Sequence, residues 1–162
     1  MLNIALSILL TLLQTPHFGK IVGLVKPPEG SKITQTAHVA LLPPKYTEVW
    51  NKQVQTRLDN YWELFKPDFA KNREHFSEYN RAAQVESFRY ITANMRREMG
   101  EGASKLIKDS TPTGQFEFAN VPFGTYELLV QTTINGQDFV WSKTVDVQSE
   151  IPIFVDFGKP VS

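Results

Sequence analysis

One stretch of sequence decides the fold: Gly114-Gln115-Phe116-Glu117-Phe118-Ala119-Asn120-Val121-Pro122-Phe123-Gly124-Thr125-Tyr126-Glu127-Leu128-Leu129-Val130. Phe116 and Phe118 alternate with polar or small residues, so both rings point to one face of a strand. Pro122 presets φ for the first corner of a turn, and Gly124 lies where turns favour glycine. The alternation then resumes at Tyr126, Leu128 and Val130. The stretch therefore predicts a strand, a tight turn and a second strand.

The composition sets limits on the kind of protein. A chain of 162 residues with 41% apolar and 12% aromatic residues can bury the core of one domain. The 17 basic and 17 acidic residues cancel, so the charge does not point to nucleic acid or anionic lipid as a partner. The absence of cysteine excludes disulfide bonds and cysteine-based zinc sites.

The first residues are apolar and predict export. Leu2–Leu13 matches the apolar region of a secretory signal peptide, and it is shorter than the roughly 20 residues that a membrane-spanning helix needs. No Lys or Arg precedes this region, and no clear small-x-small cleavage site follows it. We expect residues 1–17 to be a signal peptide and leader, so the protein would be secreted, periplasmic or on the cell surface. The alternative is that Leu2–Leu13 forms a first strand or helix of the domain.

Two β-rich segments follow this region. In 18–26, Ile21 and Val25 share a face, with Gly23 between them where another backbone can approach closely. The segment 34–42 alternates fully: one face carries Ala37, Val39 and Leu41, and the other carries His38, Ala40 and Leu42. Pro43 and Pro44 end this strand, because proline cannot donate to a strand ladder.

The C-terminal part predicts a hairpin and a last strand. Asn135-Gly136 favours a type I′ turn between two strands, since both residues tolerate a positive φ. After the turn, Phe139 and Trp141 share a face with two later valines, Val145 and Val147. The final strand is expected over 151–157.

Together these motifs resemble the carboxypeptidase regulatory-like domain. The resemblance covers Phe18–Leu42 and the chain from Thr111 onward, a little over half of the sequence. It implies a mainly β fold, a prealbumin-like seven-stranded Greek-key sandwich related to Cna-B and starch-binding-like modules, over residues 18–162. It implies no peptidase activity, because this module accompanies catalytic domains without supplying their catalytic residues.

An α-helical hairpin is expected as an insertion over residues 46–107. A stripe at helical spacing comprises Trp50, Val54, Leu58, Tyr61, Trp62 and Phe65. Pro67 is expected to end the first helix, with Asp68 starting the second. The second stripe, from Phe69 to Met99, shifts phase near Asn80–Gln84, where we expect fraying or a break. Since an insertion with adjacent ends costs its host little, we expect a short linker to replace 46–107 without unfolding the sandwich.

The sequence carries little catalytic chemistry. His75 and Glu78 are one helical turn apart and could share a metal, but a structural site needs about four ligands. No nucleophile elbow, metalloprotease helix or phosphate-binding loop is present. Cna-B relatives can form a Lys–Asn isopeptide bond promoted by a Glu; here Val130 stands in the place of that Glu, so we expect no crosslink.

The leading hypothesis is a non-catalytic exported β-sandwich module with a structural or protein-interaction role and no cofactor or metal. A first alternative is a carbohydrate-binding module in which exposed rings stack on sugars, using Trp141, Tyr46 and Trp50. A second alternative is an enzyme with its site on the helical insertion, at His75 and Glu78. The expected partner is a protein or a glycan, with no nucleic acid and no stable transmembrane span.

Overall fold

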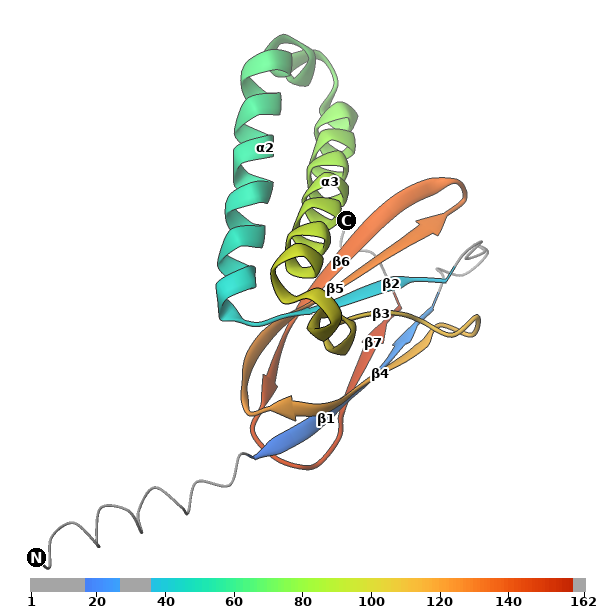
Figure 1. Ribbon diagram of the computed structural model, residues 1–162. Helices are drawn as coiled ribbons and strands as arrows, with labels where there is room; N and C mark the ends of the chain where they lie inside the picture. The colour runs from blue at the N-terminus through green and yellow to red at the C-terminus, as the bar shows by residue number, and fades with distance from the viewer. Residues whose placement is uncertain (1–16, 27–35, 159–162) are drawn as a thin grey trace, which may run out of the picture.

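The computed structural model describes residues 17–26 and 36–158 (Figure 1). The predicted signal peptide and leader, apart from His17, lies outside the described residues. The described elements are β1 (Phe18–Val25), β2 (His38–Leu42), α2 (Pro44–Lys71), α3 (Arg73–Met99), the 3-10 helix η1 (Gly100–Lys105), β3 (Ile107–Asp109), β4 (Gln115–Pro122), β5 (Gly124–Ile134), β6 (Gln137–Val147) and β7 (Ile153–Phe157).

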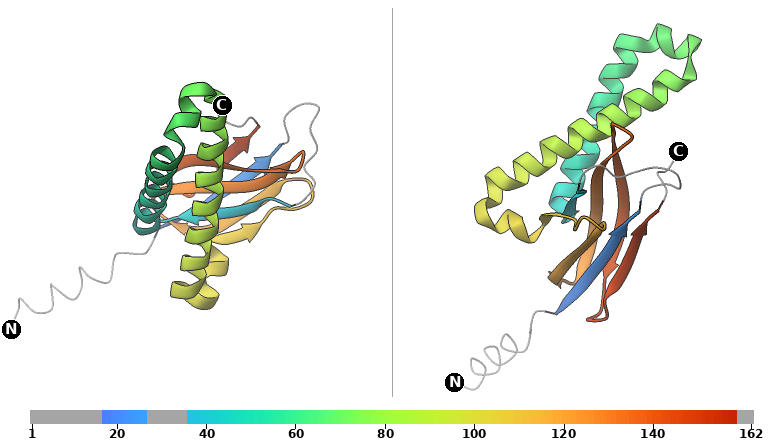
Figure 2. Two further views of the ribbon diagram at one scale, coloured as in Figure 1. Left: turned by 90° about the horizontal axis from the view of Figure 1, so that it is seen from above. Right: turned by 90° about the vertical axis from the view of Figure 1, so that its right-hand side faces the viewer.

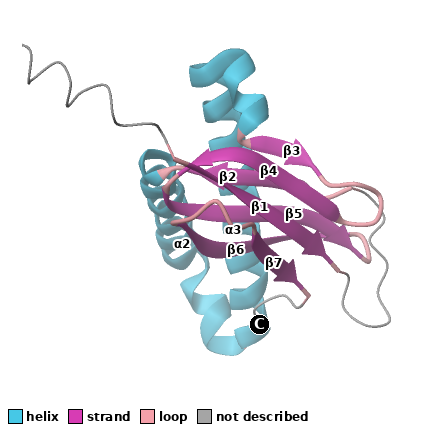
Figure 3. Cartoon of the chain, turned by 90° about the horizontal axis from the view of Figure 1, so that it is seen from below, coloured by secondary structure: helices cyan, strands magenta, loops and turns pink. Residues whose placement is uncertain are grey.

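The strands form two sheets. The three-stranded sheet has the order β4-β1-β7, and the four-stranded sheet has the order β3-β2-β5-β6. β1 pairs antiparallel with β4 and parallel with β7, whereas all pairs in the larger sheet are antiparallel. The right-hand view of Figure 2 shows the two helices against the outer face of the four-stranded sheet. Figure 3 shows the same arrangement from below. The molecule therefore has three layers: sheet, sheet and helices.

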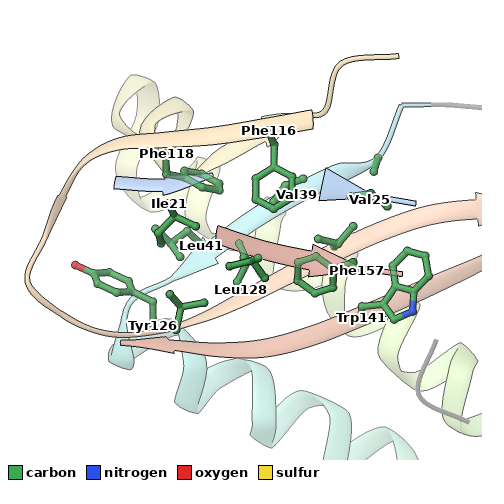
Figure 4. Packing of buried hydrophobic residues seen from close by; sticks show 14 of the residues in the cluster. Ile21, Val25, Val39, Leu41, Phe116, Phe118, Tyr126, Leu128, Trp141 and Phe157 are labelled. Atoms are coloured by element: carbon green, nitrogen blue, oxygen red, sulfur yellow. The ribbon is translucent and has the colours of Figure 1, made fainter. Parts of the chain in front are cut away.

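The first core fills the space between the two sheets (Figure 4). We call it the sandwich core. It contains all seven residues that alternation predicts for it: Val39, Leu41, Phe116, Phe118, Tyr126, Leu128 and Val130. The shared parity of these positions on paired strands places them together, so the strand faces predicted from the sequence are confirmed.

The second core lies between the four-stranded sheet and the helices, and we call it the helix-side core. Ala40 and Leu42 of β2 and Leu129 of β5 enter it, since their parity is opposite to that of the sandwich core. From α3 it receives mainly Phe88 and Ile91. The four-stranded sheet is thus buried on both faces.

The mainly β expectation needs correction, because the fold is mixed α/β. The helices α2 and α3 have 28 and 27 residues and together hold about as many residues as the seven described strands. The resemblance points only to the sandwich and treats the helices as an addition. In the structure, they form a full layer that covers an apolar sheet face.

The break between the two helices lies later than the sequence predicts. Pro67 lies inside α2, which continues to Lys71, and the chain turns at Asn72. Asn72 has an extended backbone, and its side-chain Oδ1 accepts a hydrogen bond from the Glu74 backbone N–H at 3.0 Å. An asparagine N-cap satisfies one free amide at a helix start, and Asp68 does not take that role here.

The helix α3 runs without a break through Asn80–Gln84. The phase shift of its apolar stripe has another cause. Phe76 and Tyr79 pack near the hairpin turn, whereas Phe88 and Ile91 pack on the sheet. The stripe therefore rotates where α3 changes its packing partner from α2 to the sheet.

The turns and short strands predicted from the sequence agree with the structure only in part. The predicted hairpin at Asn135-Gly136 is confirmed, with φ of 51° and 80° at the two residues. Asn120 also has a positive φ, of 54°, beside an irregularity in the β1–β4 register, and no sequence pattern predicts this conformation. Sequence alternation does not predict β3 either, because a strand of three residues is too short to show it.

Candidate interaction surface on the helical hairpin

The three aromatic residues predicted to stack on sugars are all buried. Trp141 lies in the sandwich core, with its ring centroid 6.4 Å from that of Phe157. Tyr46 and Trp50 lie in the helix-side core. Each is less than a tenth exposed, so none presents a ring face to solvent. In this structure these three rings stabilise the two cores and do not form a carbohydrate surface.

His75 and Glu78 lie in the first turns of α3. His75 is partly buried and Glu78 is exposed. Within residues 17–26 and 36–158, no three His, Asp or Glu side chains come close enough together to hold a metal ion. The enzymatic alternative therefore gains no further group from the described part of the chain.

The base of the hairpin is fixed by a carboxylate that joins the two helices. Lys45 Nζ and Tyr46 Oη, both at the start of α2, donate to Glu98 Oε2 near the end of α3, at 2.7 and 3.0 Å. Asn94 Nδ2 donates to the other oxygen at 2.9 Å. These hydrogen bonds, with that from Lys45 the largest cause, lower the pKa of Glu98 to about 2. The carboxylate is charged at neutral pH and ties the two helix ends together.

The helix α3 is also tied to the β5–β6 hairpin. Arg89 donates to Asp138 Oδ2 at 2.7 Å, and the Arg81 guanidinium lies over the Phe139 ring, 5.4 Å from its centroid. These contacts come from the part of α3 that crosses the sheet. They hold the base of the hairpin against the sandwich.

The far end of the hairpin has an aromatic cluster of its own. We call it the tip cluster, and its members are Tyr61, Trp62, Phe65, Phe69, Phe76 and Tyr79. Trp62 stacks on Phe69 at 5.5 Å between ring centroids, and Phe76 meets Phe69 edge-on at 5.7 Å. Phe65 stacks on Tyr79 at 4.6 Å. Such offset and edge-on pairs are favourable geometries for aromatic rings.

The tip cluster covers no sheet, and two of its rings face solvent. Figures 1 and 2 show the upper half of the hairpin extending beyond the strands. Phe69 is buried at the centre, while Trp62 is 43% and Phe76 is 49% exposed on either side of it. The sequence predicts the aromatic stripe, but it does not show which half of that stripe lacks a sheet to cover.

Two further observations concern the membrane and the polar surroundings of the tip. No helix in the described part of the chain is both long and apolar enough to cross a bilayer. The Lys66 ammonium lies over the Trp62 ring, 5.9 Å from its centroid, so a cation borders the exposed indole. An aromatic surface with a charged rim is typical of the centre and border of protein interfaces.

Comparisons with known proteins give one distant similarity to report. No family model matches the chain, and no curated protein matches it in sequence. Among solved structures, it is similar to the full-length major pilin RrgB from Streptococcus pneumoniae, with 8% identity and a TM-score of 0.28. The match covers 88% of this chain and 30% of the pilin, so this chain spans less than a third of that protein's length. A similarity this distant defines neither the family nor the function of this chain. The description of the fold given above is based on the strands of this chain and their pairing alone.

Proposed function

We propose that this protein is a non-catalytic, exported β-sandwich module that binds another protein through the tip of its helical hairpin. The observation that carries this proposal is the tip cluster, where Trp62 and Phe76 flank the buried Phe69 and remain about half exposed. The rest of the hairpin has a structural task, because it covers the sheet. The tip has none.

The rigidity of the tip supports this role. Phe69 contacts Trp62, Phe76 and Tyr79, so the exposed rings are held by their neighbours before any partner binds. Large aromatic side chains that are ordered in advance lose little conformational entropy on binding, and they are enriched among residues that dominate interface energies.

The resemblance to the carboxypeptidase regulatory-like domain supports the non-catalytic part of the proposal. Seven described strands in two sheets agree with the number expected for its prealbumin-like Greek-key sandwich. Domains of that family accompany other domains without supplying catalytic residues. Export is supported by the apolar segment Leu2–Leu13, and sequencing the N-terminus of the mature protein from its native host tests that part.

The interaction can be tested with matched aromatic variants. A partner captured by the wild-type chain is first identified, and its Kd is then measured for Trp62→Ala and Phe76→Ala. Controls are Tyr90→Ala, exposed to a similar degree on α3 outside the tip, and Phe154→Ala, exposed on the smaller sheet. We expect each tip variant to weaken binding about tenfold or more, which is about 1.4 kcal/mol, and the controls to bind normally.

Two results would contradict the proposal. Loss of binding in Phe154→Ala alone would move the interface to the outer face of the three-stranded sheet. Unchanged binding in all four variants would show that the tip has no part in recognition. Circular dichroism of each variant must match the wild type, so that a lost interaction is not mistaken for lost structure.

A further inference from the structure

The strand β7 forms an open edge of the three-stranded sheet. Within the part of the chain that the structure describes, its one strand neighbour is β1. The right-hand view of Figure 2 shows β7 in dark red beside β1 in blue, on the side of the molecule away from the helices. An open edge presents backbone N–H and C=O groups that can pair with a further strand.

One hydrogen bond shows which backbone groups of β7 point to the open edge. The Lys26 N–H donates to the Phe157 carbonyl at 3.1 Å, so the backbone groups of Phe157 point toward β1. This direction alternates from one residue to the next along a strand. The N–H and C=O groups of Phe154 and Asp156 therefore point away from β1, to the open edge.

Phe154 makes this edge unusually apolar. At 79%, it is the most exposed large apolar side chain among the described residues. Its ring lies on the outer face of the smaller sheet, where it lines a groove with Val22 and Leu24 of β1. Open edges of soluble proteins are usually protected by a charged side chain at such a position. An apolar ring in the middle of an open strand instead favours pairing with another strand.

We propose that β7 pairs antiparallel with β7 of a second copy of this chain, with Phe154 of each copy opposite Asp156 of the other. The twofold axis of this dimer passes beside Val155. Residues that exchange both backbone hydrogen bonds alternate with residues that exchange none in an antiparallel pair. The two Phe154–Asp156 pairs therefore form four backbone hydrogen bonds, and the two small sheets join into one sheet across the axis.

The two neighbouring registers are less favourable. If Phe154 lay opposite Phe154, Asp156 would lie opposite Pro152 of the other copy, and proline has no N–H to donate. If Asp156 lay opposite Asp156, two carboxylates would face each other, and like charges directly opposite are destabilising. The proposed register avoids both problems. It also leaves Asp156 beside Lys26, whose ammonium donates to its carboxylate at 2.9 Å.

The exposed ring explains why the partner is a second copy. In the proposed register the two Phe154 side chains lie on the same face of the joined sheet, at diagonal positions that aromatic side chains can span. Each ring is then covered by the identical ring of the other copy. The 17 basic and 17 acidic residues of the chain cancel, so net charge does not oppose association. This interface is separate from the tip cluster and does not depend on the function proposed for it.

Sedimentation equilibrium of the full chain, from about 10 µM to about 1 mM, tests the dimer. An interface of two five-residue strands is smaller than a standard one, so we expect weak association, with a Kd of about 100 µM. Phe154→Lys should raise this Kd at least tenfold. Leu64→Lys, at a site 71% exposed on α2, and Trp62→Ala in the tip cluster should leave it unchanged. A chain that stays monomeric at 1 mM, or an equal loss in the control variants, would overturn the proposal.

The absence of cysteine from the chain allows the register itself to be tested. Phe154→Cys and Asp156→Cys are oxidised separately and as an equal mixture. Directly opposite residues of a hydrogen-bonded pair have Cα atoms about 5.5 Å apart, a separation that suits a disulfide. We therefore expect the mixed disulfide to form at least fivefold faster than either self-disulfide. Equal rates for all three disulfides, or a faster self-disulfide of either variant, would overturn the proposed pairing.

Discussion

At the residue scale, Gly23 shows how closely the sandwich is packed. A Cβ atom added there would overlap the ring of Phe116, a buried side chain on the neighbouring strand β4. The sequence predicts a close approach at this glycine, but it suggests another backbone; the structure places an aromatic ring there instead. Because Gly23 has no side chain, the ring of Phe116 on the paired strand can occupy the space beside it.

We therefore expect Gly23→Ala to destabilise the fold by about 1–3 kcal/mol, as is usual when atoms are inserted into a packed core. Urea unfolding at constant slope would measure the loss. Gly102→Ala is the control, because the nearest atoms to a Cβ there lie at 3.9 Å. If Phe116→Leu relieves the overlap, the double variant will lose less stability than the two single losses added together.

Phe118 provides a second residue-scale prediction. It is fully buried in the sandwich core, so Phe118→Ala should lower the free energy of unfolding by about 3–5 kcal/mol through lost burial and a cavity. A loss below about 1 kcal/mol in denaturant melts would mean that the ring is not packed as described.

The sequence predicts the positions of core residues better than it predicts which aromatic side chains are exposed. Period-two alternation places Phe116, Phe118 and Leu128 correctly, because a strand has only two faces and one must be buried. The same pattern cannot show whether Trp141 faces solvent or core, since an aromatic ring fits either side of a half-buried sheet. Exposure of Trp62 and Phe76 depends on where the sheet ends beneath the helices, which no local pattern encodes.

At the element scale, the hairpin of α2 and α3 has two halves with different partners. The base packs on the sheet and is tied by Glu98, whereas the tip packs only on itself. The aromatic stripe predicted from the sequence is present in both halves. Its misplaced break near Pro67 shows that a proline in the last turns of a helix does not always end it, because a better cap, here Asn72, can lie a few residues later.

The Glu98 carboxylate makes the hairpin base sensitive to acid. Its pKa is about 2 in the folded chain against an ordinary value of 4.5, so the charged form stabilises the fold above about pH 4.5. This contribution should disappear as the pH falls from about 4.5 to about 2. Unfolding measured across that range should show a smaller loss in Glu98→Gln than in the wild type, and high salt should reduce the difference. Identical pH profiles would contradict the assigned hydrogen bonds.

At the scale of the whole molecule, the helical layer is part of the fold and not only an insertion. Replacing residues 46–107 by a linker would uncover Ala40, Leu42 and Leu129, which are fully buried. The sequence-based expectation that the sandwich folds without the hairpin is therefore revised. We expect the full deletion to aggregate or to lose its cooperative melting transition, because an apolar sheet face would be exposed.

A shorter deletion separates structure from recognition. Removing 61–79 and joining Asn60 to Asn80 with a Gly-Ser linker deletes the tip cluster but keeps the residues of the helix-side core. We expect this variant to melt cooperatively and to lose its protein partner. If circular dichroism shows that it does not fold, the tip cluster is needed for the hairpin itself. If it folds and still binds, recognition lies elsewhere.

The pairing of β1 with β7 determines when the smaller sheet can form during synthesis of the chain. Ile21 of β1 pairs with Ile153 of β7, so β1, the central strand of the smaller sheet, pairs with a strand that is synthesised more than a hundred residues later. During synthesis, this sheet cannot close until the last strand has left the ribosome, and closing so long a loop is slow. The export proposed above requires an unfolded polypeptide in the translocation channel, and a chain whose smaller sheet closes late meets that requirement.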